Sequence, residues 1–353
     1  MALAAASLAL FIFAAAQLNT LALVLAPVAA AYLIVYSFTK RFTWTANLLL
    51  GGALAIAPSG AWIGVRGSLS WEPVLLSVAG ILARHREDLR GQVKLLFQPA
   101  EENMVGARQM ISEGVMDNPS VDRVLGFHLW NALPMGQIGV KPGVIFASAD
   151  ELLLVIKGRG GHGAMPHQTI DPVTMSAQVI SALQTLMSRE KHPLQGAVLT
   201  IGAIHGGTAF NVIADRVEMK GTLRTFAEET RQMFLRRIPE VMAGVCAALN
   251  GTFEFETVRG CPPVENDPTV ADFLHGLASR VVGQANLPSF EPTTAGDDMA
   301  LFLRKAPGCY FVVGSSTPSA GLDAPHHNSA FDFDEEALSI AAEILLRGTL
   351  EYL

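Results

Sequence analysis

Residues 151–158, ELLLVIKG, are an apolar stretch that begins a regular series of predicted strands and helices. Alternating apolar residues are typical of strands, and apolar residues spaced three and four apart are typical of helices. In chain order, these patterns predict strand Glu151–Gly158, helix Asp171–Arg189, strand Ala197–Ile204, strand Arg216–Arg224, helix Glu228–Asn250 and strand Thr252–Val258. This β-α-β-β-α-β order predicts a ferredoxin-like two-layer domain.

Strand and helix patterns continue on both sides of this segment, so we expect it to be inserted into a second domain. The flanking predictions are strand Val93–Pro99, helix Glu101–Gly114, strand Val121–Phe127, helix Pro268–Val281, strand Cys309–Gly314 and helix Asp334–Leu353. Alternating strands and helices of this kind predict the α/β fold class.

Charged residues are distributed unevenly along the 353 residues, whose net charge is -7. Residues 1–79 contain only Lys40, Arg41, Arg66 and Glu72. A helix that spans a bilayer needs about 20 apolar residues. The uncharged first 39 residues therefore predict nearly two transmembrane helices with a break at Asn19, and the two cations that follow indicate a cytoplasmic turn. The apolar run 47–65 predicts a further span.

Composition argues against several other classes of protein. No stretch is rich in Lys and Arg, so nucleic acid is not an expected partner. The three cysteines are odd in number and lack CxxC spacing, which favours neither a disulfide framework nor a cysteine zinc site. A secretory signal is disfavoured because no basic segment precedes the apolar start.

Carboxylates and histidines follow the predicted strands, where α/β folds bind ligands. Glu101 and Glu102 come after the strand that ends in FQP, His128 ends the next strand in GFHLWN, and His326-His327 lies in the loop PHHNSAF. One carboxylate can bind a metal ion while its neighbour acts as a base, and imidazole is a common ligand of zinc-like ions. Each residue alone also fits an exposed helix start or a surface histidine. Together they indicate a hydrolytic metal centre.

Three further polar residues are candidates for substrate contacts. His162 lies among glycines in GRGGHGAMPH, and a histidine displayed on such a loop can stabilise an oxyanion. Arg224, at a predicted strand end, can pair with a substrate carboxylate, with Asn211 as its polar partner. A solvent-exposed turn histidine and a surface ion pair are the structural alternatives.

Five motifs occur in order over about residues 80–353: FQPAEE, GFHLWN, GRGGHGAMPH, FNVIADRVEMKGTLRTF and PHHNSAFDFDEEAL. Together they resemble metal-dependent amidohydrolases of the aminoacylase, hippurate hydrolase and indole-acetyl-amino-acid hydrolase type. The resemblance implies a dinuclear-aminopeptidase-like catalytic domain, an inserted lid domain that dimerises, a divalent metal such as Zn or Mn, and hydrolysis of N-acyl amino acids.

The resemblance also implies a role for each candidate residue. Glu101 would be the general base, and Glu102, His128 and His327 would be metal ligands. His162 of the neighbouring subunit would act on the scissile carbonyl. Asn211 and Arg224 would bind the substrate. His327 is preferred to His326 because the family's ligand directly precedes the Asn/Ser of this motif.

Two metal ligands of that family have no counterpart in this sequence. The family's upstream motif, HxCGHDxHxxMLL, supplies a Cys that bridges both metal ions and a His that binds one. Aligning its MLL with residues 74–76 places Arg66 at the Cys and Ser68 at the His. Neither side chain replaces a bridging thiolate. We therefore expect an incomplete metal site and reduced or no activity.

Residues 1–79 instead resemble an internal fragment of the 4-hydroxybenzoate polyprenyltransferase family, through YSFTKRFTW and APSGAWIGVRGSLSW. That family binds its diphosphate substrate with Asp-rich motifs, and residues 1–79 contain no Asp. The predicted regions are a membrane-helical fragment 1–79, a catalytic domain 80–146 and 262–353 that lacks its N-terminal part, and a lid and dimerisation domain 147–261. A gene junction near residues 77–82 accounts for this arrangement.

The predicted function is metal-dependent hydrolysis of small N-acyl amino acids by a membrane-attached homodimer whose hydrolase part is cytoplasmic. Two alternatives remain open at this stage. One is a membrane prenyltransferase relative, and the other is a non-catalytic, membrane-tethered dimerisation module.

Overall fold

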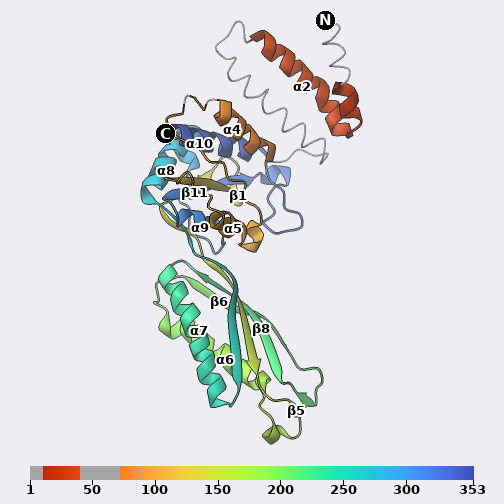
Figure 1. Cartoon of the computed structure of the whole chain (residues 1–353), viewed down its shortest axis with the longest axis vertical. Helices are drawn as coiled ribbons and strands as arrows, with labels where there is room; N and C mark the ends of the chain where they lie inside the picture. The colour runs from red at the N-terminus through yellow and green to blue at the C-terminus, as the bar shows by residue number, and fades with distance from the viewer. Residues whose placement is uncertain (1–10, 40–71, 85, 88) are drawn as a thin grey trace.

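The computed structural model describes residues 11–39, 72–84, 86–87 and 89–353. Figure 1 shows an upper body that contains β1 and β11 and a lower body that contains β6 and β8, joined by extended strands. The predicted span 47–65, the cations at 40 and 41, and the family-aligned positions Arg66 and Ser68 lie outside the described residues.

The lower body is an antiparallel sheet of order β6-β8-β4-β9 with two helices on it. In chain order its elements are β4 (Ala149–Lys157), α6 (Pro172–Thr185), β6 (Ala197–Gly206), β8 (Arg216–Thr225), α7 (Glu228–Ala248) and β9 (Thr252–Cys261). The β-α-β-β-α-β order read from the sequence is therefore the order in the structure. The first predicted helix is longer than α6 because a π-helical turn, η3 (Leu186–Glu190), continues it.

Local sequence explains why these elements form where they do. Leu152, Leu154 and Ile156 alternate along β4 and are fully buried beneath α6 and α7. Asp171 caps α6, because its side chain accepts hydrogen bonds from two backbone N–H groups of the first turn, and Pro172 occupies the first helical position.

The upper body has a three-stranded sheet of order β1-β11-β2 between two layers of helices. Its strands are β1 (Val124–Pro134), β2 (Ile138–Gly139) and β11 (Gly308–Ser316), with β3 (Gly143–Phe146) pairing separately with β10 (Val264–Asn266). The helices are α5 (Gly106–Ser112) and α9 (Met299–Leu303) on one face, and α8 (Pro268–Val282) and α10 (Glu336–Tyr352) on the other. Every residue of β11 is buried, as expected for a central strand that runs parallel to β1.

One strand prediction for the upper body was wrong, and the bounds of another were wrong. Residues 93–99 form no ladder with any described residue: Leu96 packs into the core, whereas Leu95 and Phe97 are 43% and 54% exposed. An alternating pattern becomes a strand only where a partner supplies hydrogen bonds. The strand predicted for residues 121–127 extends to Pro134 as β1, so His128 lies within the strand and not at its end.

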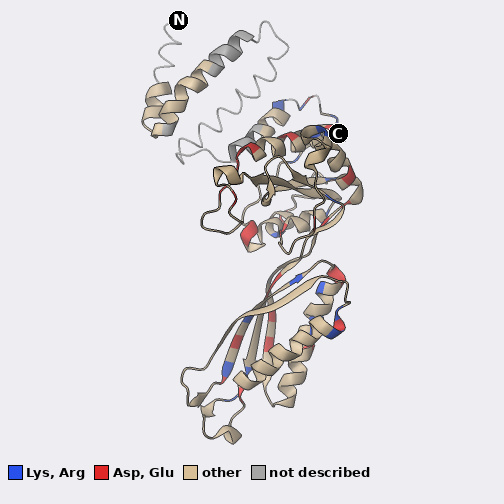
Figure 2. Cartoon of the chain, turned by 180° about the vertical axis from the view of Figure 1, so that it is seen from behind, with Lys and Arg blue, Asp and Glu red and all other residues tan. Residues whose placement is uncertain are grey.

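The N-terminal region contains a helix break where the sequence predicted one. α2 (Thr20–Thr39) follows Asn19, whose side-chain oxygen accepts a hydrogen bond from the N–H of Ala22 at 2.9 Å. Figure 2 shows no Lys, Arg, Asp or Glu in the described part of α2. α4 (Glu72–Arg84) packs against α10, and its Val78 and Leu82 are buried.

None of the helices in the described ranges combines the length and the apolar character needed to cross a membrane.

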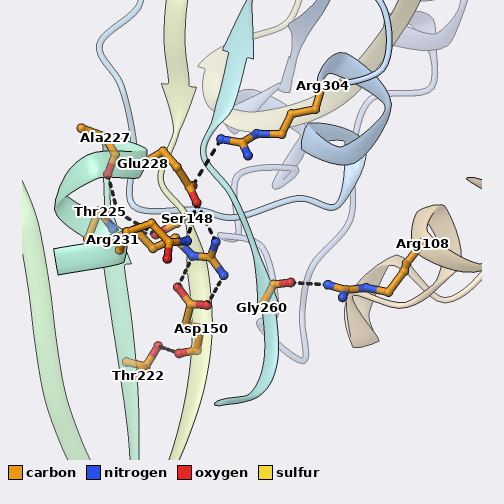
Figure 3. Close-up of polar contacts among 11 residues, drawn as sticks. Arg108, Ser148, Asp150, Thr222, Thr225, Ala227, Glu228, Arg231, Gly260 and Arg304 are labelled. Atoms are coloured by element: carbon orange, nitrogen blue, oxygen red, sulfur yellow. Dashed lines mark hydrogen bonds and ion pairs between the residues drawn. The ribbon is translucent and has the colours of Figure 1, made fainter. Parts of the chain in front are cut away.

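Polar contacts join the two bodies where the connecting strands meet α7 (Figure 3). Arg108 on α5 donates a hydrogen bond to the carbonyl oxygen of Gly260 on β9 at 2.7 Å. Arg304, which follows α9, lies 3.4 Å from the carboxylate of Glu228 at the start of α7. The upper and lower bodies therefore contact each other through side chains as well as through the chain itself.

Candidate metal centre

Three carboxylates from two distant segments meet in the upper body. Oxygen atoms of Glu101, Asp297 and Asp298 all lie within 4.8 Å of one another. Glu101 begins η1 (Glu101–Asn103), and the two aspartates precede α9 and are 3% and 0% exposed. Neither aspartate was predicted from the sequence, although the adjacent acidic pair in the segment AGDDMA is a signal for such a site.

Protein donors already occupy the oxygens of the two aspartates. Asp297 accepts hydrogen bonds from the hydroxyl of Tyr310 at 2.7 Å and from the backbone N–H two residues further on at 2.8 Å. Asp298 accepts from the N–H of Ala107 at 3.0 Å and from the side-chain amide of Gln98. Because Gln98 and Ala107 flank the Glu101-Glu102 pair, Asp298 fixes the backbone on both sides of it.

This environment changes the acidity of Glu101. Burial, followed by the charges of Asp297, Glu102 and Asp298, raises the pKa of Glu101 from an ordinary 4.5 to about 8. Burial also raises the pKa of Asp298, although its hydrogen bonds to Ala107 and Gln98 oppose the change. A carboxyl group with a pKa near the working pH is suited to take up and release protons.

The backbone is strained around the Glu101-Glu102 pair. Ala100 and Met104 both adopt the left-handed conformation, with φ of 56° and 55°, which costs roughly 1–2 kcal/mol per residue. Gly106 is required, because a Cβ there would lie 1.6 Å from the carbonyl oxygen of Pro99. The single helix predicted for residues 101–114 is therefore wrong: the segment divides into η1 and α5.

The loop PHHNSAF, residues 325–331, is called the histidine loop below, and it brings His327 close to a second predicted metal ligand. The Nε2 atom of His327 lies 4.0 Å from a carboxylate oxygen of Glu102, and both side chains are 75% exposed. The ring of His128 lies 5.3 Å from the ring of His326, measured between centroids. The Nδ1 atom of His128 contacts the carbonyl oxygen of Leu129. If Nδ1 carries the proton and donates to that oxygen, the unprotonated Nε2 is available to accept a hydrogen bond or to bind a metal ion.

Glu102 and His327 fit a divalent ion in type and almost in spacing, whereas among the described residues His128 is not within ligand spacing of both of them. With metal–ligand distances of about 2.0 Å, ligand atoms around a tetrahedral ion are roughly 3.3 Å apart. The 4.0 Å separation of Glu102 and His327 needs only a small side-chain adjustment, and neither side chain is buried. Carboxylate oxygen and imidazole nitrogen are both suitable ligands for zinc-like ions.

His162 and Asn211 lie together at the far end of the lower body, where β5 (Gly161–His162) pairs with β7 (Val212–Ile213). The N–H of Gly163 donates to the carbonyl oxygen of Asn211 at 2.8 Å. The N–H of Ala164 donates to Nδ1 of His162 at 3.0 Å, so a neutral ring carries its proton on Nε2 and presents a donor. Phe210, beside Asn211, is fully exposed.

Arg224 lies on β8 at the opposite end of the lower body, next to the upper body. The eight residue-to-residue steps from Arg216 to Arg224 along β8 span about 26 Å at the usual rise of roughly 3.3 Å per residue. Asn211 is therefore not beside Arg224 within one chain. The Nη1 atom of Arg224 is buried without a hydrogen-bond partner among the described residues, and a Cβ on Gly296, the residue before Asp297, would lie 3.1 Å from it.

Together, the α/β upper body, its carboxylate and histidine site and the four-stranded lower body are those of a metallopeptidase-like amidohydrolase. Residues 66–350 match the sequence profile of peptidase family M20/M25/M40, and the chain belongs to this family. Residues 1–84 match the UbiA prenyltransferase family, so the two matched ranges overlap over residues 66–84, which include α4.

Named relatives agree with this assignment. The chain is 38% identical to the N-acetylcysteine deacetylase of Bacillus subtilis over 76% of this chain and 68% of the relative. It is 34% identical to the IAA-amino acid hydrolase ILR1-like 4 of Arabidopsis thaliana over 79% and 64%. A crystal structure of the YXEP protein of Bacillus subtilis, a dinuclear metal-binding peptidase from the M20 family, superposes with a TM-score of 0.65 at 33% identity, covering 79% and 70%.

Proposed function

We propose that this protein hydrolyses the amide bond of small N-acyl amino acids with the help of a divalent metal ion. The observation that carries the proposal is the meeting of Glu102 and His327, from distant parts of the chain, at 4.0 Å beside Glu101. Membership of a family that contains an N-acetylcysteine deacetylase and an IAA-amino acid hydrolase supports the reaction class.

In the proposed site, Glu102, His128 and His327 hold the ion. When bound, it supplies Lewis acidity that polarises the amide carbonyl. Glu101 takes a proton from the attacking water and passes it to the nitrogen of the leaving amine. In the metal-free protein the pKa of Glu101 is raised to about 8 by burial and by neighbouring carboxylates, and the positive charge of a bound ion would favour the ionised form that accepts a proton.

Arg224 is proposed to bind the carboxylate of the amino acid. Its buried Nη1 has no hydrogen-bond partner in the described part of the chain and lies against the loop that leads to Asp297, so an anion there would satisfy it. A guanidinium–carboxylate contact is among the stronger hydrogen-bonded ion pairs.

His162 and Asn211 are proposed to act in the site of a second copy of this chain. They sit at the end of the lower body that lies away from the upper body, so they do not reach Glu101 of their own chain (Figure 1). The Nε2–H of His162 would donate to the oxyanion that forms from the substrate carbonyl. The exposed Phe210 next to them is suited to a contact between the two copies.

We propose further that metal binding is weakened, because Arg66 and Ser68 stand at two ligand positions of the related amidohydrolases. Calorimetric titration of the metal-free protein with Zn²⁺ and Mn²⁺, with an assay on N-acetyl amino acids, tests this. We expect at most one weakly bound ion per chain and slow hydrolysis. Two tightly bound ions and rapid turnover would contradict the weakening, and absence of both binding and hydrolysis would contradict the proposed function.

The N-terminal region is proposed to attach the hydrolase to the cytoplasmic face of a membrane. The match of residues 1–84 to the UbiA prenyltransferase family and the absence of charged residues in α2 support this. After expression of the full chain, we expect it to stay with the membrane fraction through a high-salt wash. Recovery in the supernatant after that wash would contradict membrane attachment.

A further inference from the structure

The loop that carries His327 is attached to the central sheet through one buried side chain. Asn131 on β1 is 7% exposed, and its Nδ2 donates hydrogen bonds to the carbonyl oxygens of Ala324 at 3.0 Å and Asp332 at 2.7 Å. Its Oδ1 accepts a hydrogen bond from the hydroxyl of Ser315 on β11 at 2.5 Å. Asn131 thus links the two parallel strands to both ends of the histidine loop.

His326 forms the second attachment of this loop. Its ring lies between those of Trp130 and Phe331, at centroid distances of 5.1 Å and 4.8 Å and with 34° between the planes in each case. Its Nε2 accepts a hydrogen bond from the backbone N–H of Asn131 at 3.3 Å. A protein donor therefore already uses this nitrogen, whereas the neighbouring His327 has its Nε2 toward Glu102.

His327 depends on these attachments for its direction. It has a left-handed backbone, with φ of 63°, and its side chain is 75% exposed, so its own packing restrains it little. The residues on both sides of it in the loop are tied down, on one side by His326 and Ala324 and on the other by Asp332. The fixed neighbours set the backbone direction from which the His327 ring projects.

We propose that Asn131 and His326 are positioning residues that hold His327 for metal binding. The inference rests on the proposed function, because it takes His327 as a metal ligand. It assigns the two adjacent histidines different tasks: His326 anchors the loop by stacking and by accepting one hydrogen bond, and His327 faces the metal. Groups that orient a ligand commonly change metal affinity by about 10–100-fold when removed.

The test uses the full chain, with Zn²⁺ affinity measured by calorimetry and the visible absorption spectrum of bound Co²⁺ as a report on ligand geometry. Asn131→Asp keeps the acceptor for Ser315 but loses the donors to Ala324 and Asp332. His326→Phe keeps an aromatic ring between Trp130 and Phe331 but loses the acceptor. We expect each variant to bind Zn²⁺ roughly tenfold or more weakly and to alter the Co²⁺ spectrum.

Asn266→Asp is the matched control, because Asn266 is another buried asparagine of the upper body. Its Nδ2 donates to the carbonyl oxygens of Lys141 and Tyr310, at 3.0 Å and 2.9 Å, away from the histidine loop. We expect this variant to lose a similar amount of thermal stability while its Zn²⁺ affinity and Co²⁺ spectrum stay as in the wild type. Equal loss of affinity in the control would overturn the positioning role.

His327→Ala separates failure of this inference from failure of the proposed function. If His327→Ala weakens Zn²⁺ binding while Asn131→Asp and His326→Phe leave affinity and spectrum unchanged, the positioning role is wrong and the ligand assignment stands. If His327→Ala itself binds Zn²⁺ like the wild type, the ligand assignment is wrong, and the positioning role falls with it.

Discussion

Replacing Arg231 by alanine is expected to destabilise the protein by about 3–5 kcal/mol, because it leaves a buried carboxylate without its partner. Arg231 donates two hydrogen bonds, at 2.7 Å and 2.8 Å, to the two oxygens of Asp150, whose side chain is 0% exposed (Figure 3). Burial already raises the pKa of Asp150 in spite of the adjacent guanidinium. Without the guanidinium, the charged carboxylate would be far less favourable in the folded state.

The measurement is the free energy of unfolding in urea at pH 7. Arg216→Ala is the control: Arg216 also pairs with a carboxylate, Glu218 at 3.2 Å, but both side chains are more than a third exposed. Exposed pairs contribute roughly 0–1 kcal/mol, so the control should unfold nearly as the wild type does. A loss for Arg231→Ala no larger than that of the control would show that the buried pair adds little.

Replacing Glu101 by glutamine is expected to reduce the protein's hydrolysis of an N-acetyl amino acid by about 10²–10⁴-fold, the usual contribution of a general base. The amide is the same size but cannot accept the proton. Metal affinity should stay nearly unchanged, because Glu102 and not Glu101 is the proposed ligand. Glu113→Gln, at an exposed carboxylate that accepts a hydrogen bond from Gln109, is the control and should keep wild-type activity. Unchanged turnover in Glu101→Gln would remove the general-base assignment.

The same variant has a second readout that needs no turnover. Because the folded-state pKa of Glu101 is raised from 4.5 to about 8, the unfolded chain ionises first as pH rises. The metal-free wild type should therefore lose stability between about pH 4.5 and 8, whereas Glu101→Gln should lose less. Parallel curves of unfolding free energy against pH for the two proteins would contradict the raised pKa.

Mixing two variants tests the proposal that His162 of one chain acts in the active site of a second copy. A Glu101→Gln chain still carries a normal His162, and a His162→Ala chain still carries a normal Glu101. If His162 acts in a second copy, a mixed dimer contains one site with both groups intact. Activity should then rise above that of either variant alone, and no recovery after mixing under exchange conditions would contradict action across copies.

Local features of the sequence predicted most elements of the fold. The four long strands and two α-helices of the lower body lie where alternation and helical spacing placed them, because a cap such as Asp171 and a buried alternation such as that of β4 act over a few residues. The helix break at Asn19 was predicted for the same reason. The strand 93–99 and the helix 101–114 were not, since the first depends on a pairing partner and the second on the close approach of Gly106 to Pro99.

The sequence by itself determined the β-α-β-β-α-β order of the lower body, the family, and the residue types of a hydrolytic metal site. Only the tertiary structure decided which of those residues meet. It placed Asp297 and Asp298 against Glu101, gave His326 and His327 different surroundings, and put Asn211 and Arg224 at opposite ends of the lower body. The physical reason is that backbone propensity and capping are local, whereas burial, pKa and ligand geometry depend on residues that folding brings together from distant parts of the chain.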